Sequence, residues 1–332
     1  MKIAIVKLSA MGDIVHAIVA LQFIKKYNPN IKIDWYVEKA FFQVLENNPD
    51  IDNIYTLNLK AIKKDKKQLF SEIKRVKNYS KNNRYDLVID AQGLIKSAIV
   101  AKLLGKNVAG FSKESIREKA ASYFYKNKVS IAYDENTIDR NAKVLSSPLG
   151  FNISNSDILS MKPFLYFQNE DKIIYKYLKE DKKNIIFVIG STWESRNYPK
   201  EKFLKIANEL KGNCLVIWGN EDEKNKALWL EKESKYIKAM PKINLNSLKA
   251  LISKCDLLIG NDTGPTHMAW ALCVPSITIF GPTPINRVYQ TSINKVVKSS
   301  SKVDHYKLNK NDFSIREIDE NIILDIARKL LN

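Results

Sequence analysis

Cysteine, histidine and long apolar runs are all scarce in this chain. Its 332 residues include three cysteines, Cys214, Cys255 and Cys273, and three histidines. Each cysteine lies in or beside an apolar run, so we expect buried free thiols and a reducing compartment. No stretch reaches the ~18 apolar residues that a membrane-spanning helix needs. The apolar run at the N-terminus is too short for a signal peptide, and a cytoplasmic protein is expected.

Several nucleotide and metal motifs are also missing. Neither half contains G-x-G-x-x-G, which disfavours a nicotinamide dehydrogenase, and no Walker A sequence is present. Arg-rich runs, an aromatic RNA-binding motif and a Cys/His zinc pattern are absent, which disfavours nucleic acid as a partner. Asp50-Ile51-Asp52 matches the Asp-x-Asp pattern of metal-dependent sugar transferases. Because it follows Asn47-Asn48-Pro49, we interpret it as a turn.

Acidic residues are too few to balance the basic ones. The chain has 54 Lys+Arg against 36 Asp+Glu, a net charge of +18, and lysines are spread over its whole length. A basic surface favours anionic partners: nucleic acid, phosphorylated sugars or an anionic membrane face. We therefore expect peripheral association with the inner face of the cytoplasmic membrane.

What the chain does contain is a regular alternation of short apolar runs and helical patterns, typical of doubly wound parallel sheets. In the first half the expected strands are 2–8, 31–37, 51–57, 86–90 and 108–111, and the helices 14–26, 39–47, 66–82, 95–104, 115–125 and 137–149. In the second half they are strands 184–189, 214–218, 256–259 and 276–280, with helices 200–210, 223–233, 245–253, 265–272 and 315–331.

The length suits two domains that each bury a core. The pattern fades around residues 152–172, where Pro163 intervenes. We expect an N-terminal Rossmann-like domain over 1–155 and a C-terminal one over 165–312. The amphipathic helix within 313–332 is expected to pack back on the N-terminal domain.

The stretch at 259–267 is the strongest candidate for a ligand site. An apolar strand runs into Gly260-Asn261-Asp262-Thr263-Gly264-Pro265-Thr266-His267, and a buried helix follows. Unpaired N–H groups and the helix dipole concentrate at such a start, which favours an anion. An ordinary strand–turn–helix link is the structural alternative.

A similar turn follows the first strand. Ser9-Ala10-Met11-Gly12-Asp13 connects it to a helix, and Gly12 would let a ligand approach the backbone closely. Asp13 is either a helix cap or a carboxylate aimed into the crevice at the carboxyl end of the strand. His16 lies near Asp13 on the helix and is interpreted as a packing residue.

Further turns at Gly190-Ser191-Thr192, Gly219-Asn220-Glu221 and Gly281-Pro282 follow other strands of the second half. All would open on a cleft between the carboxyl ends of the two sheets. Such a cleft suits a nucleotide diphosphate, with amides for the phosphates and a carboxylate for the ribose.

Motifs in both halves resemble one family. They are Lys7-Leu8-Ser9-Ala10-Met11-Gly12-Asp13-Ile14-Val15-His16, Asp90-Ala91-Gln92-Gly93-Leu94-Ile95-Lys96-Ser97-Ala98, Trp218-Gly219, Met240-Pro241-Lys242, Asp262-Thr263-Gly264-Pro265-Thr266-His267 and Phe280-Gly281-Pro282-Thr283. In this order they resemble the bacterial lipopolysaccharide heptosyltransferases, glycosyltransferase family nine. The second motif is typical of the branch that adds the first heptose.

The resemblance implies a GT-B fold, with two Rossmann-like domains facing each other across a cleft. It implies inverting transfer of L-glycero-D-manno-heptose from ADP-heptose to the inner Kdo of Kdo2-lipid A, with no metal and no cofactor. The N-terminal domain would bind the acceptor and the C-terminal domain ADP-heptose. One alternative is a family member with a later core acceptor. A non-catalytic two-lobed binding protein is another, but it gives no reason for Asp13 beside a phosphate-type turn.

The resemblance also implies roles for single residues. Asp13 would be the base, and Arg196, where the family usually has Lys, would pair with phosphate. Met240 and His267 are either donor contacts or packing residues, and single lysines are either acceptor contacts or solvated charges. Donor-binding candidates are Ser9, Met11, Gly12, Thr192, Arg196, Glu221, Glu223, Met240, Asp262, Thr263, Gly264, Thr266 and His267. Acceptor-binding candidates are Lys60, Lys63, Lys64, Gln92, Lys96, Arg117 and Arg140.

Overall fold

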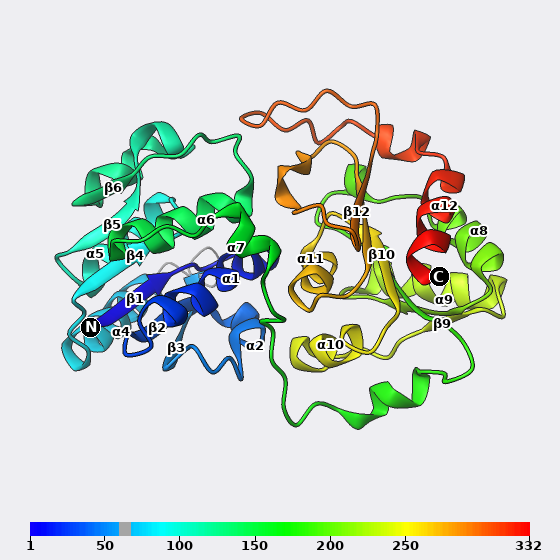
Figure 1. The fold of residues 1–332 in the computed structure, drawn as a ribbon, viewed down its shortest axis with the longest axis horizontal. Coiled ribbons are helices and arrows are strands. Elements are labelled where there is room, and N and C mark those ends of the chain that lie inside the picture. Colours follow the sequence, from blue (N-terminus) through cyan, green and yellow to red (C-terminus); the bar gives the residue numbers. More distant parts are fainter. Residues whose placement is uncertain (60–67) are drawn as a thin grey trace. The chain divides into compact units, whose positions relative to one another are not determined.

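The computed structural model describes residues 1–59 and 68–332. It divides into two compact units, Met1–Tyr166 and Phe167–Asn332, each with one six-stranded parallel sheet covered by helices (Figure 1). The strand orders are β3-β2-β1-β4-β5-β6 and β12-β11-β10-β7-β8-β9. In both sheets the strand order reverses beside the first strand, so the predicted α/β class with two doubly wound sheets is confirmed.

The first unit contains six strands. They are β1 (Lys2–Val6), β2 (Lys32–Glu38), β3 (Asn53–Leu57), β4 (Leu87–Asp90), β5 (Val108–Phe111) and β6 (Asn127–Val129). Its α-helices are α1 (Met11–Tyr27), α2 (Phe42–Leu45), α4 (Gln68–Asn82), α5 (Ile95–Leu104), α6 (Thr137–Ser146) and α7 (Asn155–Leu159). Its 3-10 helices are η1 (Lys39–Phe41), η2 (Lys113–Ser115), η3 (Lys119–Phe124) and η4 (Ser147–Leu149).

The second unit repeats the arrangement. Its strands are β7 (Asn184–Val188), β8 (Asn213–Ile217), β9 (Ile237–Ala239), β10 (Leu257–Asn261), β11 (Ser276–Phe280) and β12 (Asn294–Lys298). Its α-helices are α8 (Lys200–Leu210), α9 (Glu221–Glu233), α10 (Leu245–Ile252), α11 (Gly264–Ala271) and α12 (Glu320–Leu331). Its 3-10 helices are η5 (Lys172–Tyr177), η6 (Glu194–Arg196), η7 (Ile285–Arg287) and η8 (Ser314–Glu317).

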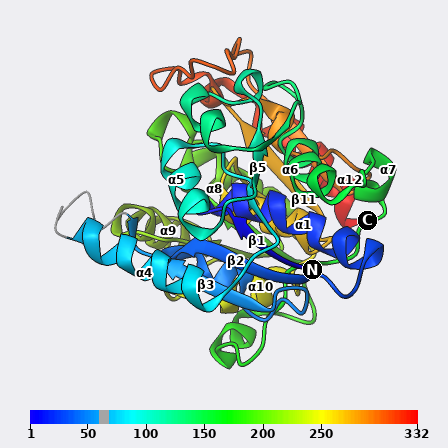
Figure 2. The same ribbon diagram turned by 90° about the vertical axis from the view of Figure 1, so that its left-hand side faces the viewer.

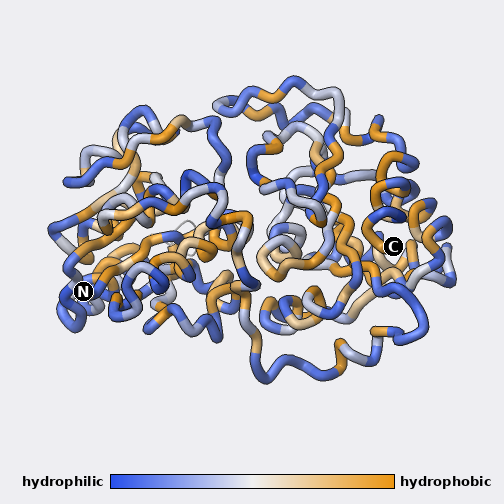
Figure 3. The backbone as a smooth tube through the Cα atoms, in the orientation of Figure 1, coloured by the Kyte–Doolittle hydropathy of each residue, from blue (hydrophilic) through white to orange (hydrophobic). Residues whose placement is uncertain are grey.

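Helices cover both faces of the first sheet. On one face α1 packs against α6, and on the other α5 contacts both α4 and η3 (Figure 2). The central strand β4 is buried at every position, as expected for a parallel strand covered on both sides. The hydropathy-coloured tube shows apolar residues gathered along the strands of each sheet (Figure 3). Within residues 1–59 and 68–332, no helix combines the length and apolarity that crossing a bilayer requires.

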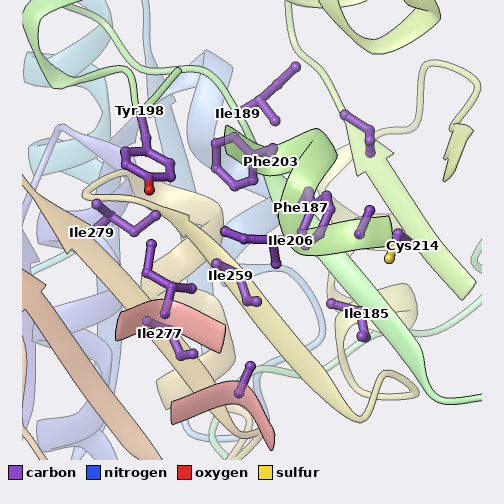
Figure 4. Close-up of a cluster of buried hydrophobic side chains, with 14 of the residues drawn as sticks. Ile185, Phe187, Ile189, Tyr198, Phe203, Ile206, Cys214, Ile259, Ile277 and Ile279 are labelled. Atoms are coloured by element: carbon purple, nitrogen blue, oxygen red, sulfur yellow. The ribbon is translucent and has the colours of Figure 1, made fainter. Parts of the chain in front are cut away.

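The core of the second unit lies between its sheet and α8, α9 and α12. Phe187 of β7 and Phe203 of α8 meet with ring centroids 5.3 Å apart, and Tyr198 packs edge-on against Phe203 at 5.5 Å (Figure 4). Ile259 and Ile277 of the neighbouring strands complete this layer and are fully buried. The apolar runs predicted as strands therefore supply the core directly.

The prediction for the C-terminal helix is wrong. α12 belongs to the second unit and packs against α8 and the adjoining sheet. Ile323 and Leu324 are buried there, and Glu320 pairs with Lys205 at 2.8 Å. Because β12 ends near this surface, the helix finds an apolar partner within its own unit.

Two other predictions differ from the structure. Residues 115–125 do not form one α-helix: they contain the last residue of η2 and the short 3-10 helix η3. The hydroxyls of Ser112 and Ser115 bond each other, and Ser115 also accepts from the Ile131 N–H. Such side-chain bonds compete with regular helix formation. The short strands β6, β9 and β12 were not predicted. They lie at sheet edges, where partial exposure weakens the apolar pattern.

Candidate active site

Gln92 organises the turn that follows β1. Its Oε1 accepts from the backbone N–H groups of Leu8 (2.8 Å) and Ser9 (3.0 Å), and its Nε2 donates to the Ser9 carbonyl (2.5 Å). The side chain thus satisfies three backbone groups of the loop after β1. Gln92 thus holds the loop that leads to Asp13, and its predicted contact with the acceptor stays a prediction.

Asp90, at the end of β4, explains the motif around Gln92. Its carboxylate accepts from the N–H groups of Gln92 and Gly93 and from the hydroxyls of Ser97 (2.9 Å) and Tyr125 (2.7 Å). Gly93 adopts φ +71°, a left-handed conformation that favours glycine. Burial raises the pKa of Asp90, and these four hydrogen bonds oppose the rise. The motif therefore builds a rigid corner beside the first turn.

Asp13 occupies the third position of α1. Its Oδ2 accepts from the Ala10 N–H at 3.2 Å, as a capping carboxylate does. The described residues form no hydrogen bond to its Oδ1, and the side chain is half-buried at the carboxyl end of β1. Both interpretations of Asp13 are compatible with this geometry, because capping uses only one of its oxygens.

Lys7 is a buried charge to which the sequence interpretation gave no role. Its Nζ donates to the Ala91 carbonyl (2.7 Å) and to Asn141 Oδ1 (3.0 Å). Burial lowers the pKa of the Lys7 ammonium, while the carboxylates of Asp13 and Asp90 oppose the shift. The Lys7 amine therefore joins Ala91, at the end of β4, to Asn141 of α6. In the sequence, the position of Lys7 within the motif of residues 7–16 was the signal that could have identified it.

In the second unit, Asp262 is the centre of a buried polar network. Its Oδ2 accepts from Arg196 Nη2 (2.8 Å) and from the Thr283 hydroxyl (2.9 Å), and its Oδ1 is 2.9 Å from His267 Nε2. These groups come from the loops after β7, β10 and β11 and from α11. Because those strands are adjacent, their carboxyl ends bring the groups together.

The charge on Asp262 is strongly stabilised. Burial by itself raises the pKa of this carboxyl, but Arg196, the hydrogen bond to His267 and Arg287 outweigh burial and hold it far below its usual range. Asp262 is therefore ionised, and one guanidinium nitrogen of Arg196 is committed to it. Arg287, from η7, was not predicted as part of this site.

Asn261 anchors the loop that carries Arg196. Fully buried at the end of β10, it donates from Nδ2 to the Ile189 carbonyl (2.8 Å) and accepts at Oδ1 from the Tyr198 N–H (3.0 Å). These contacts hold both ends of the loop after β7. The sequence interpretation included Asn261 in the central motif but gave it no role.

The start of α11 has the properties of an anion site. Thr263 caps the helix in an extended conformation and Gly264 is its first residue, followed by Pro265. Among the described residues no hydrogen bond is formed by the N–H of Thr263 or Gly264, whereas the Thr266 N–H bonds back to Thr263. Two amides and the positive end of the helix dipole therefore lie beside Arg196 and Asp262.

Glu223 lies at the carboxyl end of β8 and bonds the turn that follows this strand. Its Oε2 accepts from the Gly219 N–H (2.7 Å) and its Oε1 from Asn220 Nδ2 (2.8 Å). It also lies against Gly190, where an added Cβ would stand 2.1 Å from the carboxyl group. Glu221 points elsewhere, is mostly exposed and pairs with Lys224. Of the two predicted acids, only Glu223 lies at the ends of β7 and β8.

Comparison with known proteins places the chain in a family. Residues 73–314 match glycosyltransferase family 9 (heptosyltransferase). The chain is 38% identical to lipopolysaccharide heptosyltransferase 1 of Campylobacter coli, with 99% of each chain covered. The chain belongs to glycosyltransferase family 9.

Other proteins similar to this family 9 member are also named heptosyltransferases. Lipopolysaccharide heptosyltransferase 1 of Escherichia coli K12 is 28% identical over 93% of this chain and 97% of its own. The structure of E. coli heptosyltransferase WaaC with ADP superposes with a TM-score of 0.81, at 24% identity and with 99% and 100% of the chains covered. At that identity the likeness establishes the fold, and the predicted GT-B class is confirmed.

Four residues predicted to bind ligands have structural roles in this family 9 chain. Arg140 is buried and donates to the carbonyls of Ala132 and Ser115, with its guanidinium over Phe111. The Thr266 hydroxyl donates to the Asn261 carbonyl (2.7 Å). The Met240 N–H donates to Val216 and its carbonyl accepts from Trp218, so its backbone is engaged internally. His267 is buried against Asp262. Interior hydrogen bonds therefore hold these side chains and the Met240 backbone, and their predicted ligand contacts stay predictions.

The other predicted ligand contacts are accessible. Ser9, Met11 and Gly12 are half-buried in the first turn, and Thr192, Lys96 and Arg117 are exposed. Lys60, Lys63 and Lys64 lie outside the described residues. Their roles, and the predicted absence of a metal, stay predictions.

Proposed function

We propose that this family 9 member transfers L-glycero-D-manno-heptose from ADP-heptose to the inner Kdo of Kdo2-lipid A, with inversion and without a metal, as a peripheral protein at the inner face of the cytoplasmic membrane. Support comes from the 38% identity to a protein named lipopolysaccharide heptosyltransferase 1. Similar structures of E. coli heptosyltransferase WaaC are complexes with ADP and with ADP-2-deoxy-2-fluoro heptose. Relatives named heptosyltransferase 3 are only 24–25% identical, which favours the first-heptose acceptor.

The observation that carries the proposal is the anion site at the start of α11. The amides of Thr263 and Gly264 lie at the helix start beside the Arg196–Asp262 pair, and this combination suits a diphosphate. We assign the ribose hydroxyls to Glu223, because it lies beside Gly190 and Gly219 at the ends of β7 and β8, whereas Glu221 is exposed and pairs with Lys224.

The mechanism is one in-line displacement. Asp13 takes the proton of the acceptor hydroxyl while its oxygen attacks the anomeric carbon of heptose. The bond from that carbon to the terminal phosphate oxygen breaks, and ADP leaves with the electron pair. Arg196 and the two amides stabilise the charge that develops on the phosphate. Because attack comes from the face opposite ADP, the configuration inverts.

Incubation of ADP-heptose with Kdo2-lipid A, with and without a chelator, tests this function. Wild type is expected to transfer heptose at the same rate with and without the chelator. The Asp13→Ala variant is expected to lose ~10²-fold or more of kcat, which is the effect of removing a general base. Asp157→Ala is the matched control, since Asp157 also caps the first turn of a helix and accepts from Ser154.

Equal turnover by Asp13→Ala and wild type would remove Asp13 from the role of base. Transfer only to an acceptor that already carries heptose would replace the proposed acceptor. Binding of ADP-heptose without any transfer would favour the non-catalytic alternative.

A further inference from the structure

One helical layer of the first unit has an unusual outer surface. It consists of α4, α5 and η3, of which α5 contacts both others. α4 and α5 lie side by side over one face of the sheet (Figure 2). We call its solvent-facing side the α4–α5–η3 face. α4 and α5 begin near the carboxyl ends of the strands, the same edge at which α1 presents Asp13.

This face exposes large apolar side chains. Phe70 in the first turn of α4 is 78% exposed and Tyr123 in η3 is 74% exposed. Ile95 and Ile99, four residues apart and therefore on one side of α5, are 41% and 42% exposed. Leu69 beside Phe70 is also exposed. On the opposite layer the exposed Tyr27 is stacked on Phe151, with ring centroids 4.3 Å apart. The exposed aromatic ring of that layer therefore already packs on another aromatic side chain.

The same face carries far more positive than negative charge: its one partly exposed carboxylate is Glu118, which accepts from the Ile95 N–H at 2.8 Å. Its exposed lysines are Lys74, Lys77, Lys81, Lys96, Lys102 and Lys119. α5 and η3 contain no acidic residue, and the one acid of α4, Glu72, is buried beside Arg75. All three helices lie within the described part of the chain. Elsewhere acids and bases alternate: α9 carries both, with Asp222 paired to Lys226.

We propose that the α4–α5–η3 face docks on an anionic lipid bilayer. Aromatic and aliphatic side chains surrounded by six exposed lysines, with Glu118 held at the start of α5 by the Ile95 N–H, match the interfacial region of such a membrane: the apolar groups enter it and the lysines meet the headgroups. The inference rests on the proposed function, in which the acceptor is lipid-linked. Docking this face brings the edge that carries Asp13 to the surface where that acceptor lies.

Other occupants fit the face less well. A second copy of the same face would bring lysines against lysines, which repel. A nucleic acid would pair with the lysines but would give Ile95, Ile99 and Leu69 no partner, since its backbone is charged. A bilayer satisfies both sets of side chains at once.

The experiment uses co-sedimentation of the full chain with vesicles of phosphatidylglycerol or of phosphatidylcholine alone. The apolar variant is Phe70→Ser with Tyr123→Ser, and the charge variant is Lys74→Gln with Lys102→Gln. The matched control is Leu228→Ser with Lys232→Gln on α9, where Leu228 is 48% exposed. All these side chains are exposed, so little effect on stability is expected.

Wild type and control are expected to bind phosphatidylglycerol vesicles at least tenfold more tightly than phosphatidylcholine vesicles. Each face variant should lose at least tenfold of the binding to phosphatidylglycerol, and added salt should weaken the apolar variant further. Absence of vesicle binding by wild type, or equal losses in control and face variants, would overturn the proposal. Vesicle binding unchanged in both face variants would do the same.

Measuring turnover on two acceptors distinguishes a failure of the docking proposal from a failure of the proposed function. With acceptor in vesicles, the apolar variant should be at least tenfold slower than wild type. With a soluble acceptor from which the acyl chains have been removed, it should match wild type. Failure of wild type on both acceptors would instead count against heptose transfer itself. Equal loss on both acceptors in the variant would overturn the docking role.

Discussion

Arg196 and Asp262 form a buried ion pair with 2.8 Å between Nη2 and Oδ2, and the two residues come from loops after neighbouring strands. Their side chains are 12% and 2% exposed. The carboxylate is further held by His267 and Thr283, so it fixes where the guanidinium can lie. Arg suits this position because a planar fork can bond Asp262 with one nitrogen and present others elsewhere.

Arg196→Ala is expected to destabilise the second unit by about 3–5 kcal/mol, because it leaves a buried carboxylate without its cation. Adding Asp262→Asn should restore part of that loss. The apparent Kd for ADP should rise more than the KM for the acceptor. Urea unfolding and ADP titration measure the two effects. Lys224→Ala, which breaks an exposed pair with Glu221, is the control. An Arg196→Ala protein as stable as wild type would contradict the assigned role of the pair.

The stability contributed by Asp262 should depend on pH in one direction. Its folded pKa lies below the unfolded value, so the stabilisation is fully present above pH ~4 and is lost as the pH falls toward the folded pKa. The difference in unfolding free energy between wild type and Asp262→Asn should therefore stay constant from pH 7 to about 5. Below pH ~4 it should shrink. A difference that grows on acidification would show that the carboxyl is not stabilised in its charged form.

Gly190→Ala should displace Glu223 without unfolding the protein. The added Cβ would lie 2.1 Å from the Glu223 carboxyl carbon, which is the far end of a flexible side chain and can move. We expect ADP affinity to fall by about tenfold, the value of one charged hydrogen bond, with little change in Tm. Gly219→Ala is the matched control, since its Cβ would meet the same carboxylate at an ordinary 3.5 Å. Equal ADP affinity in both variants would exclude Glu223 from donor binding.

Ile323→Ala tests the packing of α12. Ile323 is fully buried and its neighbour Ile322 is 51% exposed. Truncating the buried side chain should cost about 2–4 kcal/mol of unfolding free energy, and Ile322→Ala should stay within about 0.5 kcal/mol. Urea unfolding followed by the tryptophans of the second unit measures both. Similar small effects in the two variants would mean that α12 does not contribute to the core of that unit.

Local sequence predicted much of this fold because parallel strands covered on both faces need continuous apolar runs. β4 and β7 are such runs, and their burial follows from composition alone. Edge strands carry a weaker signal: β6 is exposed at two of its three residues, and it was not predicted. The two turns around Asp13 and Asp262 were identified because glycine, capping residues and a strand end coincide there.

The sequence by itself determined the α/β class, the two sheets and the turns where ligands are expected, since each depends on residues close together in the chain. Only the tertiary structure decided what long-range contacts do: Gln92 holds the Ser9 loop from 83 positions away, and Arg196 meets Asp262 across 66. The tertiary structure also decided which surface α12 packs against. An amphipathic pattern states that a helix needs an apolar surface, but which surface is available depends on where the preceding strand ends.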